Sequence, residues 1–244
     1  MLPTKDAWKL DDGTVRSALR FMLGVAVGPT EAAFFRCLCG QHAYSVHHAM
    51  SCPSLAGFRT SRHNFMQALV RYLFSAGTLS TSMEPLERLL KTLRAGDKGY
   101  GKRGDIICLL LDEILNVDLS MIHPAAQEYR AAAAKGPGEA AKIRDRQKRN
   151  DHAKEGNQGY TFVPFSIETY GRLGKPAEEL LKSVADVAAS TGAVDRNTFL
   201  QWSYKELSVR LVKANQLVFK AFCGAVTKSV GTDFRLGEEV PACE

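Results

Sequence analysis

The sequence predicts a mixed α/β (α+β) protein in which helices flank a small mixed sheet. Its 244 residues have room for one large domain, or for a medium-sized domain with small appendages. Apolar residues make up 45% of the chain and charged residues 24%, which is typical of a protein with a packed core. In the middle of the chain the patterns follow the order helix, three strands, helix, strand, helix. This order favours a sheet with helices on its faces.

Helices are predicted where apolar residues recur every three or four positions. In the segment after the cysteines, Ser61 is the expected N-cap of a helix and Gly77 its expected stop. An alanine-rich, charged stretch over residues 124–156 predicts an exposed helix that is interrupted near Gly136 and Gly138. Continuous helices are predicted over residues 14–23, 62–76, 86–93, 175–189 and 195–226.

Strands are predicted for short runs of apolar, aromatic and β-branched residues. Two such runs flank Asp112 and Glu113, whose polar side chains suit a tight turn, so we expect these runs to form a hairpin. Pro164 interrupts a later run and indicates a strand at an edge or with a bulge. The predicted strands cover residues 78–83, 105–111, 114–120 and 160–167.

Three of the six cysteines crowd together beside several histidines, which favours metal binding over disulfides. Cys37, Cys39, His47 and Cys52 form the pattern C-x-C-x7-H-x4-C. Three thiolates and one imidazole suit a tetrahedral zinc ion, which would stabilise a segment too short to form a core. His48 is an alternative ligand to His47. The other interpretation is that these are ordinary buried cysteines near surface histidines.

A pair of aspartates is predicted to meet at the open end of the hairpin. Asp105 begins the first strand and Asp118 lies in the second, seven and five residues from the turn. Two carboxylates in close contact repel each other unless a cation lies between them. A Mg²⁺ or Mn²⁺ ion there would support phosphodiester hydrolysis. The alternative is that Asp105 caps a turn and Asp118 pairs with a surface cation.

The charge of the chain favours a polyanionic partner. Lysine and arginine number 32 against 26 acidic residues, which gives a net charge of +6 and a pI near 9.0. No apolar run is long enough to cross a bilayer, and residues 1–10 lack the hydrophobic core of a secretion signal. We therefore expect an intracellular protein without a membrane partner. The cations expected to contact nucleic acid are Arg103, Lys142, Arg146, Lys148 and Arg149.

Most of these cations lie in one basic helix, and this helix has two interpretations. Acidic residues alternate with its lysines and arginines, so it is also compatible with an ordinary solvated helix held by salt bridges. Beside a nuclease centre, the same cations would contact DNA phosphates, and binding would weaken steeply with salt.

Three parts of the sequence resemble the C-terminal region of site-specific non-LTR retrotransposon proteins, among them the SLACS-like elements. These parts are the Cys/His cluster, a helix that begins near Arg62 and His63, and the segment Arg103-Gly104-Asp105-x12-Asp118. The resemblance covers residues 35–220. It implies a CCHC zinc knuckle followed by a restriction-like endonuclease domain with the PD-(D/E)xK fold. It also implies a nuclear enzyme that nicks target DNA and exposes a 3′ hydroxyl for reverse transcription.

The resemblance implies roles for several acidic residues. Asp105 and Asp118 would be catalytic ligands of Mg²⁺ or Mn²⁺. Glu84, or its near neighbour Glu87, would be a further catalytic acid. Ser120 stands where the lysine of a D-x-K motif would stand, and its hydroxyl group cannot serve as a cation.

The lysine of the family commonly lies in the helix after the aspartate strand. The resemblance therefore implies Lys148 as the catalytic lysine, with Lys142 as the second candidate. The sequence departs from the family at two positions. Gly104 replaces a usual proline, which should matter little because the carboxylate does the chemistry. His152 stands where an aromatic residue often follows the lysine, and it leaves the register of this helix open.

The resemblance also suggests how the chain is organised. It contains no polymerase motif, so we expect the terminal part of a longer reading frame, a fragment or a truncated copy. The expected partners are DNA and the reverse transcriptase portion of the same element. Element RNA is a further candidate partner. The expected segments are a lead-in helical segment at 1–35, a CCHC zinc knuckle at 36–60, the endonuclease domain at 61–192, and a C-terminal helix and tail at 193–244.

Two other functions stay open at the level of sequence. In the first, the zinc segment and basic helix persist while the nuclease has decayed, so that the chain binds nucleic acid without cleaving it. In the second, the chain is an unrelated helical interaction protein that folds without zinc and has no affinity for DNA. The separation of the two aspartates distinguishes these functions from a nuclease, because one ion must reach both carboxylates.

Overall fold

The computed structural model describes residues 8–25, 27, 37, 39–40, 45–77, 80–83, 104–153, 159–192 and 194–230. These residues belong to two compact units. The second unit is Phe65–Leu207, and the first comprises the described residues before and after it. Both borders fall inside long helices, α3 (Ala56–Ala76) and α8 (Arg196–Val230). They differ from the borders expected at residues 60/61 and 192/193.

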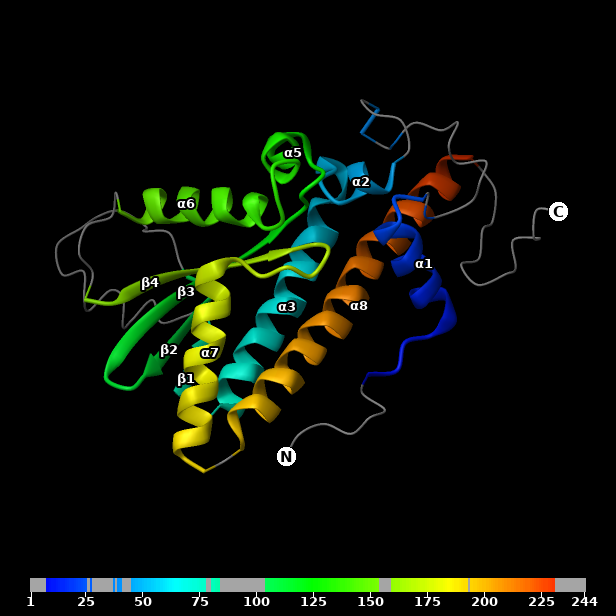
Figure 1. Ribbon diagram of the computed structural model, residues 1–244. Coiled ribbons are helices and arrows are strands. Elements are labelled where there is room, and N and C mark those ends of the chain that lie inside the picture. The colour runs from blue at the N-terminus through cyan, green and yellow to red at the C-terminus, as the bar shows by residue number, and fades with distance from the viewer. Residues whose placement is uncertain are drawn as a thin grey trace. The chain divides into compact units, whose positions relative to one another are not determined.

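The second unit contains a four-stranded mixed sheet with the order β1-β2-β3-β4 (Figure 1). The first three strands pair antiparallel, and β4 pairs parallel to β3. This confirms the small mixed sheet flanked by helices that the sequence predicts. Because β4 ends the strand order, Pro164 lies in an edge strand, where its missing N–H is tolerated. The outer side of β4 forms an isolated bridge further along, between Ile167 and Leu173. The strands are β1 (Ser80–Met83), β2 (Ile106–Leu110), β3 (Glu113–Ile122) and β4 (Thr161–Glu168).

The hairpin of β2 and β3 turns one residue earlier than expected. Leu110 pairs with Glu113, so the turn residues are Leu111 and Asp112 rather than Asp112 and Glu113. Leu111 has a φ of 53°, the left-handed conformation that a two-residue hairpin turn of this kind requires. The displaced turn leaves both predicted aspartates at the open end of the hairpin.

The parallel strands β3 and β4 are joined by two helices, α5 (Gln127–Ala133) and α6 (Glu139–Ala153). Parallel neighbours need such a crossover, because a tight turn cannot bring the chain back to the same end of the sheet. The break between the helices lies at residues 134–138, where the sequence predicts an interruption. Helix α6 packs on β3 and β4 (Figure 1).

Other helical residues of the second unit complete its core. The rings of Phe74 in α3 and Phe165 in β4 meet edge to face at 6.1 Å. Helix α7 (Lys175–Ser190) packs on β4 and buries one amphipathic face. Gly77 ends α3 as predicted, and a Cβ atom there would lie 2.3 Å from Val184 Cγ1. The close approach of α3 and α7 therefore requires glycine.

The first unit contains α1 (Asp12–Met22), α2 (Val46–Ala49), the 3-10 turn η3 (Pro53–Leu55) and the adjoining ends of α3 and α8. Helix α3 begins at Ala56, six residues before the predicted start, so the prediction of Ser61 as N-cap is wrong. The 3-10 turn leads straight into the helix, and Ser61 instead donates a hydrogen bond to the Gly57 carbonyl. The rings of Phe21 and Phe219 pack 5.1 Å apart in the core of this unit.

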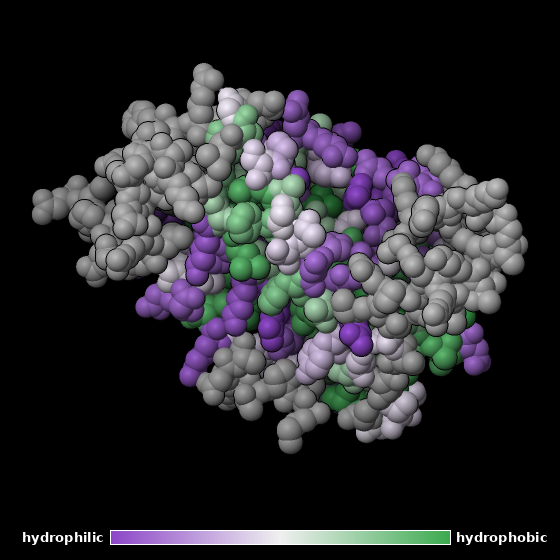
Figure 2. Space-filling view, turned by 180° about the vertical axis from the view of Figure 1, so that it is seen from behind, coloured by the Kyte–Doolittle hydropathy of each residue, from purple (hydrophilic) through white to green (hydrophobic). Residues whose placement is uncertain are grey.

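The surface carries hydrophobic and hydrophilic residues side by side. Figure 2 shows patches of hydrophobic residues interrupted by hydrophilic ones on one face. Within the ranges that the structure describes, no helix combines the length and the apolar character that crossing a membrane requires.

Candidate functional site

Asp105 and Asp118 lie near each other at the open end of the hairpin. The last paired residues of its strands are Ile106 and Val117; Asp105 directly precedes Ile106, and Asp118 directly follows Val117. Two hydrogen bonds hold Asp105 there: Asp105 N donates to Val117 O at 2.9 Å, and Leu119 N donates to Asp105 Oδ2 at 2.6 Å. The Asp105 carboxylate thus accepts a hydrogen bond from the backbone next to Asp118, and its charge acts on the Asp118 carboxyl.

Helix α6 packs on β3 in a register that matches the spacing of the strand. Arg144 Nε donates to Ser120 Oγ at 3.4 Å, and Lys148 Nζ lies 2.6 Å from Asp118 Oδ2. Four residues of a helix rise about 6 Å, and two residues of a strand rise about 6.6 Å. A step of one helical turn along α6 therefore corresponds to a step of two residues along β3. Through this register, α6 places a cation over Asp118 from 30 residues away in the sequence.

Lys148 and Asp118 form a shielded ion pair, with 21% and 15% of their side chains exposed. Burial raises the pKa of Asp118, while the hydrogen bond and charge of Lys148 lower it. The charge of Asp105 raises this pKa further, and the charge of Arg144 lowers it. Asp118 is thus a carboxylate whose charge depends on neighbouring cations. The donor set of two hard carboxylates at one place fits Mg²⁺ or Mn²⁺.

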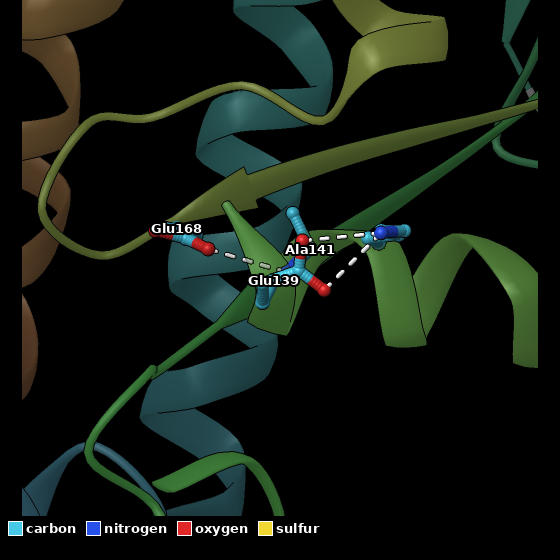
Figure 3. A network of polar contacts seen from close by, with 4 residues as sticks. Glu139, Ala141 and Glu168 are labelled. Atoms are coloured by element: carbon cyan, nitrogen blue, oxygen red, sulfur yellow. Dashed lines mark hydrogen bonds and ion pairs between the residues drawn. The ribbon is translucent and has the colours of Figure 1, made fainter. Parts of the chain in front are cut away.

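Lys142, the second candidate for the catalytic lysine, has a different partner. Its Nζ lies 3.1 Å from Glu139 Oε1 in the first turn of α6, and 62% of its side chain is exposed. In the same turn, Ala141 N donates to Glu168 Oε1 at 3.2 Å, and Figure 3 shows Glu168 directed toward this turn. Glu168 therefore satisfies an N–H at the helix start and fastens α6 to the end of β4.

The other predicted residues of this region have distinct surroundings. The ring of His152 stacks on Phe162 of β4, with a centroid distance of 4.1 Å and an interplanar angle of 13°. Its stacking sets the C-terminal end of α6 on the sheet. Arg146 and Arg149 are exposed on α6. The predicted site residues outside the described residues are Glu84, Glu87 and Arg103.

The absence of a side chain at Gly104 has a steric reason. A Cβ atom at this position would lie 1.4 Å from Asn116 Oδ1, and Asn116 is fully buried in β3. Neither proline nor any other residue with a side chain fits beside this asparagine without a shift of the hairpin. Gly104 and Asn116 therefore form a matched pair next to Asp105.

A second site lies in the first unit, where Cys37, Cys39, His48 and Cys52 converge. Their ligand atoms all lie within 4.8 Å of one another. Cys37 Sγ is 3.3 Å from Cys52 Sγ, and Cys39 Sγ is 3.2 Å from His48 Nε2. The cysteines are not oxidised, since a disulfide would bring the sulfurs to about 2.05 Å. A zinc tetrahedron with bonds of about 2.3 Å has edges of about 3.8 Å, so the cluster could hold a zinc ion.

The histidine of this cluster is His48, and the prediction of His47 is wrong. Both belong to α2, whose N-cap Ser45 accepts a hydrogen bond from His47 N. Successive residues of a helix point about 100° apart, so only one of the two imidazoles can face the cysteines. His48 does so, while the ring of His47 lies 6.3 Å from the ring of Phe21. The orientation of one short helix therefore selects His48, the alternative ligand that the sequence left open.

The cluster is set into the core of its unit. Cys37 and Cys52 are buried, and burial raises the pKa of the Cys37 thiol to about 12. A dication would favour the thiolate form instead. Gly40, with a φ of 70°, donates from its N–H to Cys37 O at 2.8 Å and forms the tight turn between the first two ligands and the rest. The residues present therefore fit a structural zinc ion.

Sequence reasoning missed Arg144 as a residue of the carboxylate site. The signal was present in the spacing, because Arg144 precedes Lys148 by one helical turn and Ser120 follows Asp118 by two strand positions. This spacing identifies Arg144 only when the direction in which α6 crosses β3 is known, and no local sequence pattern contains that direction.

The sequence matches no protein-family model and no curated protein.

Proposed function

We propose that this chain is a metal-dependent DNA endonuclease with a PD-(D/E)xK core, which nicks target DNA to prime reverse transcription of a non-LTR retrotransposon. The observation that carries the proposal is the position of Asp105 and Asp118 at the open end of the hairpin, with Lys148 of α6 paired to Asp118. Two carboxylates and one ammonium group at one place are the groups that metal-assisted phosphodiester hydrolysis needs.

The order of elements supports the same proposal. The sheet has three antiparallel strands, a crossover through α5 and α6, and a fourth strand parallel to the third; Asp118 lies in the inner strand β3, and Asp105 directly precedes the inner strand β2. The resemblance implies a core of this kind for the endonuclease. The zinc cluster in the first unit is consistent with the CCHC knuckle that precedes the endonuclease in that family.

The reaction is hydrolysis of one phosphodiester bond. A water oxygen forms a bond to phosphorus, the P–O3′ bond breaks, and the O3′ atom takes up a proton. The products are a 3′ hydroxyl and a 5′ phosphate. A bound Mg²⁺ or Mn²⁺ would lower the pKa of the attacking water and polarise the phosphate. Lys148 would move from Asp118 to the phosphate and offset the negative charge that develops there.

The proposal includes partners and a location. The DNA target would contact the exposed cations of α6, which include Arg146 and Arg149. The chain would act in the nucleus with the reverse transcriptase portion of the same element, and element RNA is a further candidate ligand. Zinc would stabilise the first unit, and Mg²⁺ or Mn²⁺ would serve the reaction.

The test is nicking of supercoiled plasmid with Mg²⁺, Mn²⁺ or EDTA. Asp105→Asn keeps an oxygen to accept the hydrogen bond from Leu119 N but removes the negative charge, so it should abolish metal-dependent nicking. Asp112→Asn is the matched control, because Asp112 lies in the exposed turn of the same hairpin. Nicking that persists in Asp105→Asn would contradict the proposal. Salt-sensitive DNA binding without nicking by the unmodified protein would instead favour the decayed, DNA-binding alternative.

A further inference from the structure

Arg144 is a half-buried cation held by neutral groups. Its Nε donates to Ser120 Oγ at 3.4 Å, and its Nη1 donates to Gln147 Oε1 at 3.3 Å. Within the described ranges no carboxylate forms an ion pair with it. The Tyr129 side chain is a further hydrogen-bond partner of the guanidinium group. A guanidinium group carries five N–H donors, so donors beyond these contacts, and a positive charge that is not in an ion pair, are available to an anion.

We propose that Arg144 binds the scissile phosphate together with Lys148, so that two cations one helical turn apart hold it over Asp105 and Asp118. This inference rests on the proposed nuclease function and adds a residue to its site. The ligand class is a phosphodiester, whose two non-bridging oxygens can accept hydrogen bonds from two different cations.

The register of α6 supports this role. Arg144 and Lys148 are separated by four positions, which places their Cβ atoms about 5–6 Å apart on one face of the helix. Their partners, Ser120 and Asp118, lie two positions apart on β3, so that Arg144 contacts Ser120 and Lys148 contacts Asp118.

The guanidinium group is oriented before any ligand arrives. Gln147, which accepts from Arg144, in turn donates from Nε2 to Glu128 Oε1 at 3.1 Å, so α5 buttresses the contact. A cation fixed by neutral acceptors loses little conformational entropy on binding a phosphate, and it does not first have to leave a carboxylate. Lys142 differs, because its ammonium group already pairs with Glu139.

The experiment compares Arg144→Gln with Arg196→Ala in the full chain. Arg196 pairs with Asp186 at 2.5 Å at the start of α8, so its loss changes the net charge equally without altering α6. The first readout is binding of a fluorescent DNA duplex in EDTA over a range of KCl concentrations. Loss of one phosphate contact should reduce the slope of log K against log salt by about 0.9 in Arg144→Gln and leave it unchanged in Arg196→Ala.

The second readout is the rate of nicking in Mg²⁺, which should fall by about 100-fold in Arg144→Gln. Arg144→Lys should recover part of the binding but little of the rate, because lysine lacks the planar fork. A protein that nicks normally with Arg144→Gln would overturn this inference and leave the proposed function intact. If the unmodified protein does not nick, the proposed function fails, and the salt slope alone decides whether Arg144 binds phosphate. Equal slopes for Arg144→Gln and Arg196→Ala would overturn the inference in that case too.

Folding of each variant is checked by the fluorescence of Trp202, which is buried in the same unit. If Arg144→Gln disturbs this signal, Arg144→Met takes its place in both readouts, because methionine also removes the charge while keeping an unbranched side chain. A salt slope and a nicking rate for Arg144→Met that equal those of Arg196→Ala would then overturn the inference.

Discussion

Replacing Lys148 with methionine removes the ammonium group that lies 2.6 Å from Asp118 Oδ2 while keeping most of the length of the side chain. The mostly buried carboxylate of Asp118 then lacks its nearest cation, while Asp105 still lies near it. A double-mutant cycle with Asp118→Asn isolates the interaction, because Asn and Met together remove both charges. We expect each single substitution to destabilise the second unit, and the double variant to lose less than the sum.

The expected coupling energy follows from the geometry of the pair. At 2.6 Å and an effective dielectric constant of about 20, the gross attraction is about 6 kcal/mol. Desolvation of two charged groups offsets much of it, and 21% and 15% exposure allows water to screen the rest. We therefore expect a net coupling of about 2 kcal/mol. The pair of Lys142 and Glu139 is the control, since 62% and 37% exposure predicts a coupling of at most about 0.5 kcal/mol.

The assay is urea unfolding in EDTA, followed by tryptophan fluorescence. The chain has two tryptophans, Trp8 and Trp202, and Trp202 lies buried in the second unit. A Trp8→Phe background therefore makes the signal specific for the unit that contains the ion pair. If the Lys148–Asp118 coupling is no larger than the Lys142–Glu139 coupling, Lys148 and Asp118 do not form a shielded ion pair. The placement of α6 on β3 would then also be wrong.

Two further predictions concern the zinc ligand and a buried carboxyl group. His48→Ala should weaken zinc binding by at least about 100-fold in a chelator competition assay, because His48 faces the cysteines. His47→Ala should bind zinc normally. If instead His47→Ala weakens zinc binding and His48→Ala does not, His47 is the ligand. Burial raises the pKa of Asp145, against the opposing effects of Ser166 and Arg149, so the folded state holds its proton more tightly than the unfolded state. The resulting stability is present below the unfolded pKa of about 3.9 and is lost as the pH rises through the raised folded pKa, so Asp145→Asn should gain stability relative to the unmodified protein toward pH 7. Unfolding free energies measured across this pH range that run parallel for the two proteins would contradict it.

Most of the secondary structure could be predicted from the sequence because it depends on local periodicity. The apolar spacing in α7 is a property of sixteen consecutive residues, and the expected helix at 175–189 matches Lys175–Ser190. The break between α5 and α6 follows from glycines and a proline in the sequence. The start of α3 could not be predicted, because a 3-10 turn before it continues the helix upstream of the apparent cap at Ser61.

The metal cluster shows where local patterns stop being sufficient. Three cysteines and a histidine pair within sixteen residues identify the ligand types, since few other structures would gather them. They do not distinguish His47 from His48. That choice depends on which way a four-residue helix faces, and this is set by the packing of Phe21 against the other imidazole.

The sequence by itself determined that Asp105 and Asp118 lie at the open end of a hairpin, because strand pairing around a short turn leaves little freedom of register. Only the tertiary structure decided which cations stand over them. Lys148 and Arg144 come from a helix 24 or more residues away from their partners, and the alignment depends on how α6 lies across β3. Glu168 at one end of α6 and the stacked His152 at the other set that alignment. Such contacts arise from packing between elements, so no pattern within either element contains them.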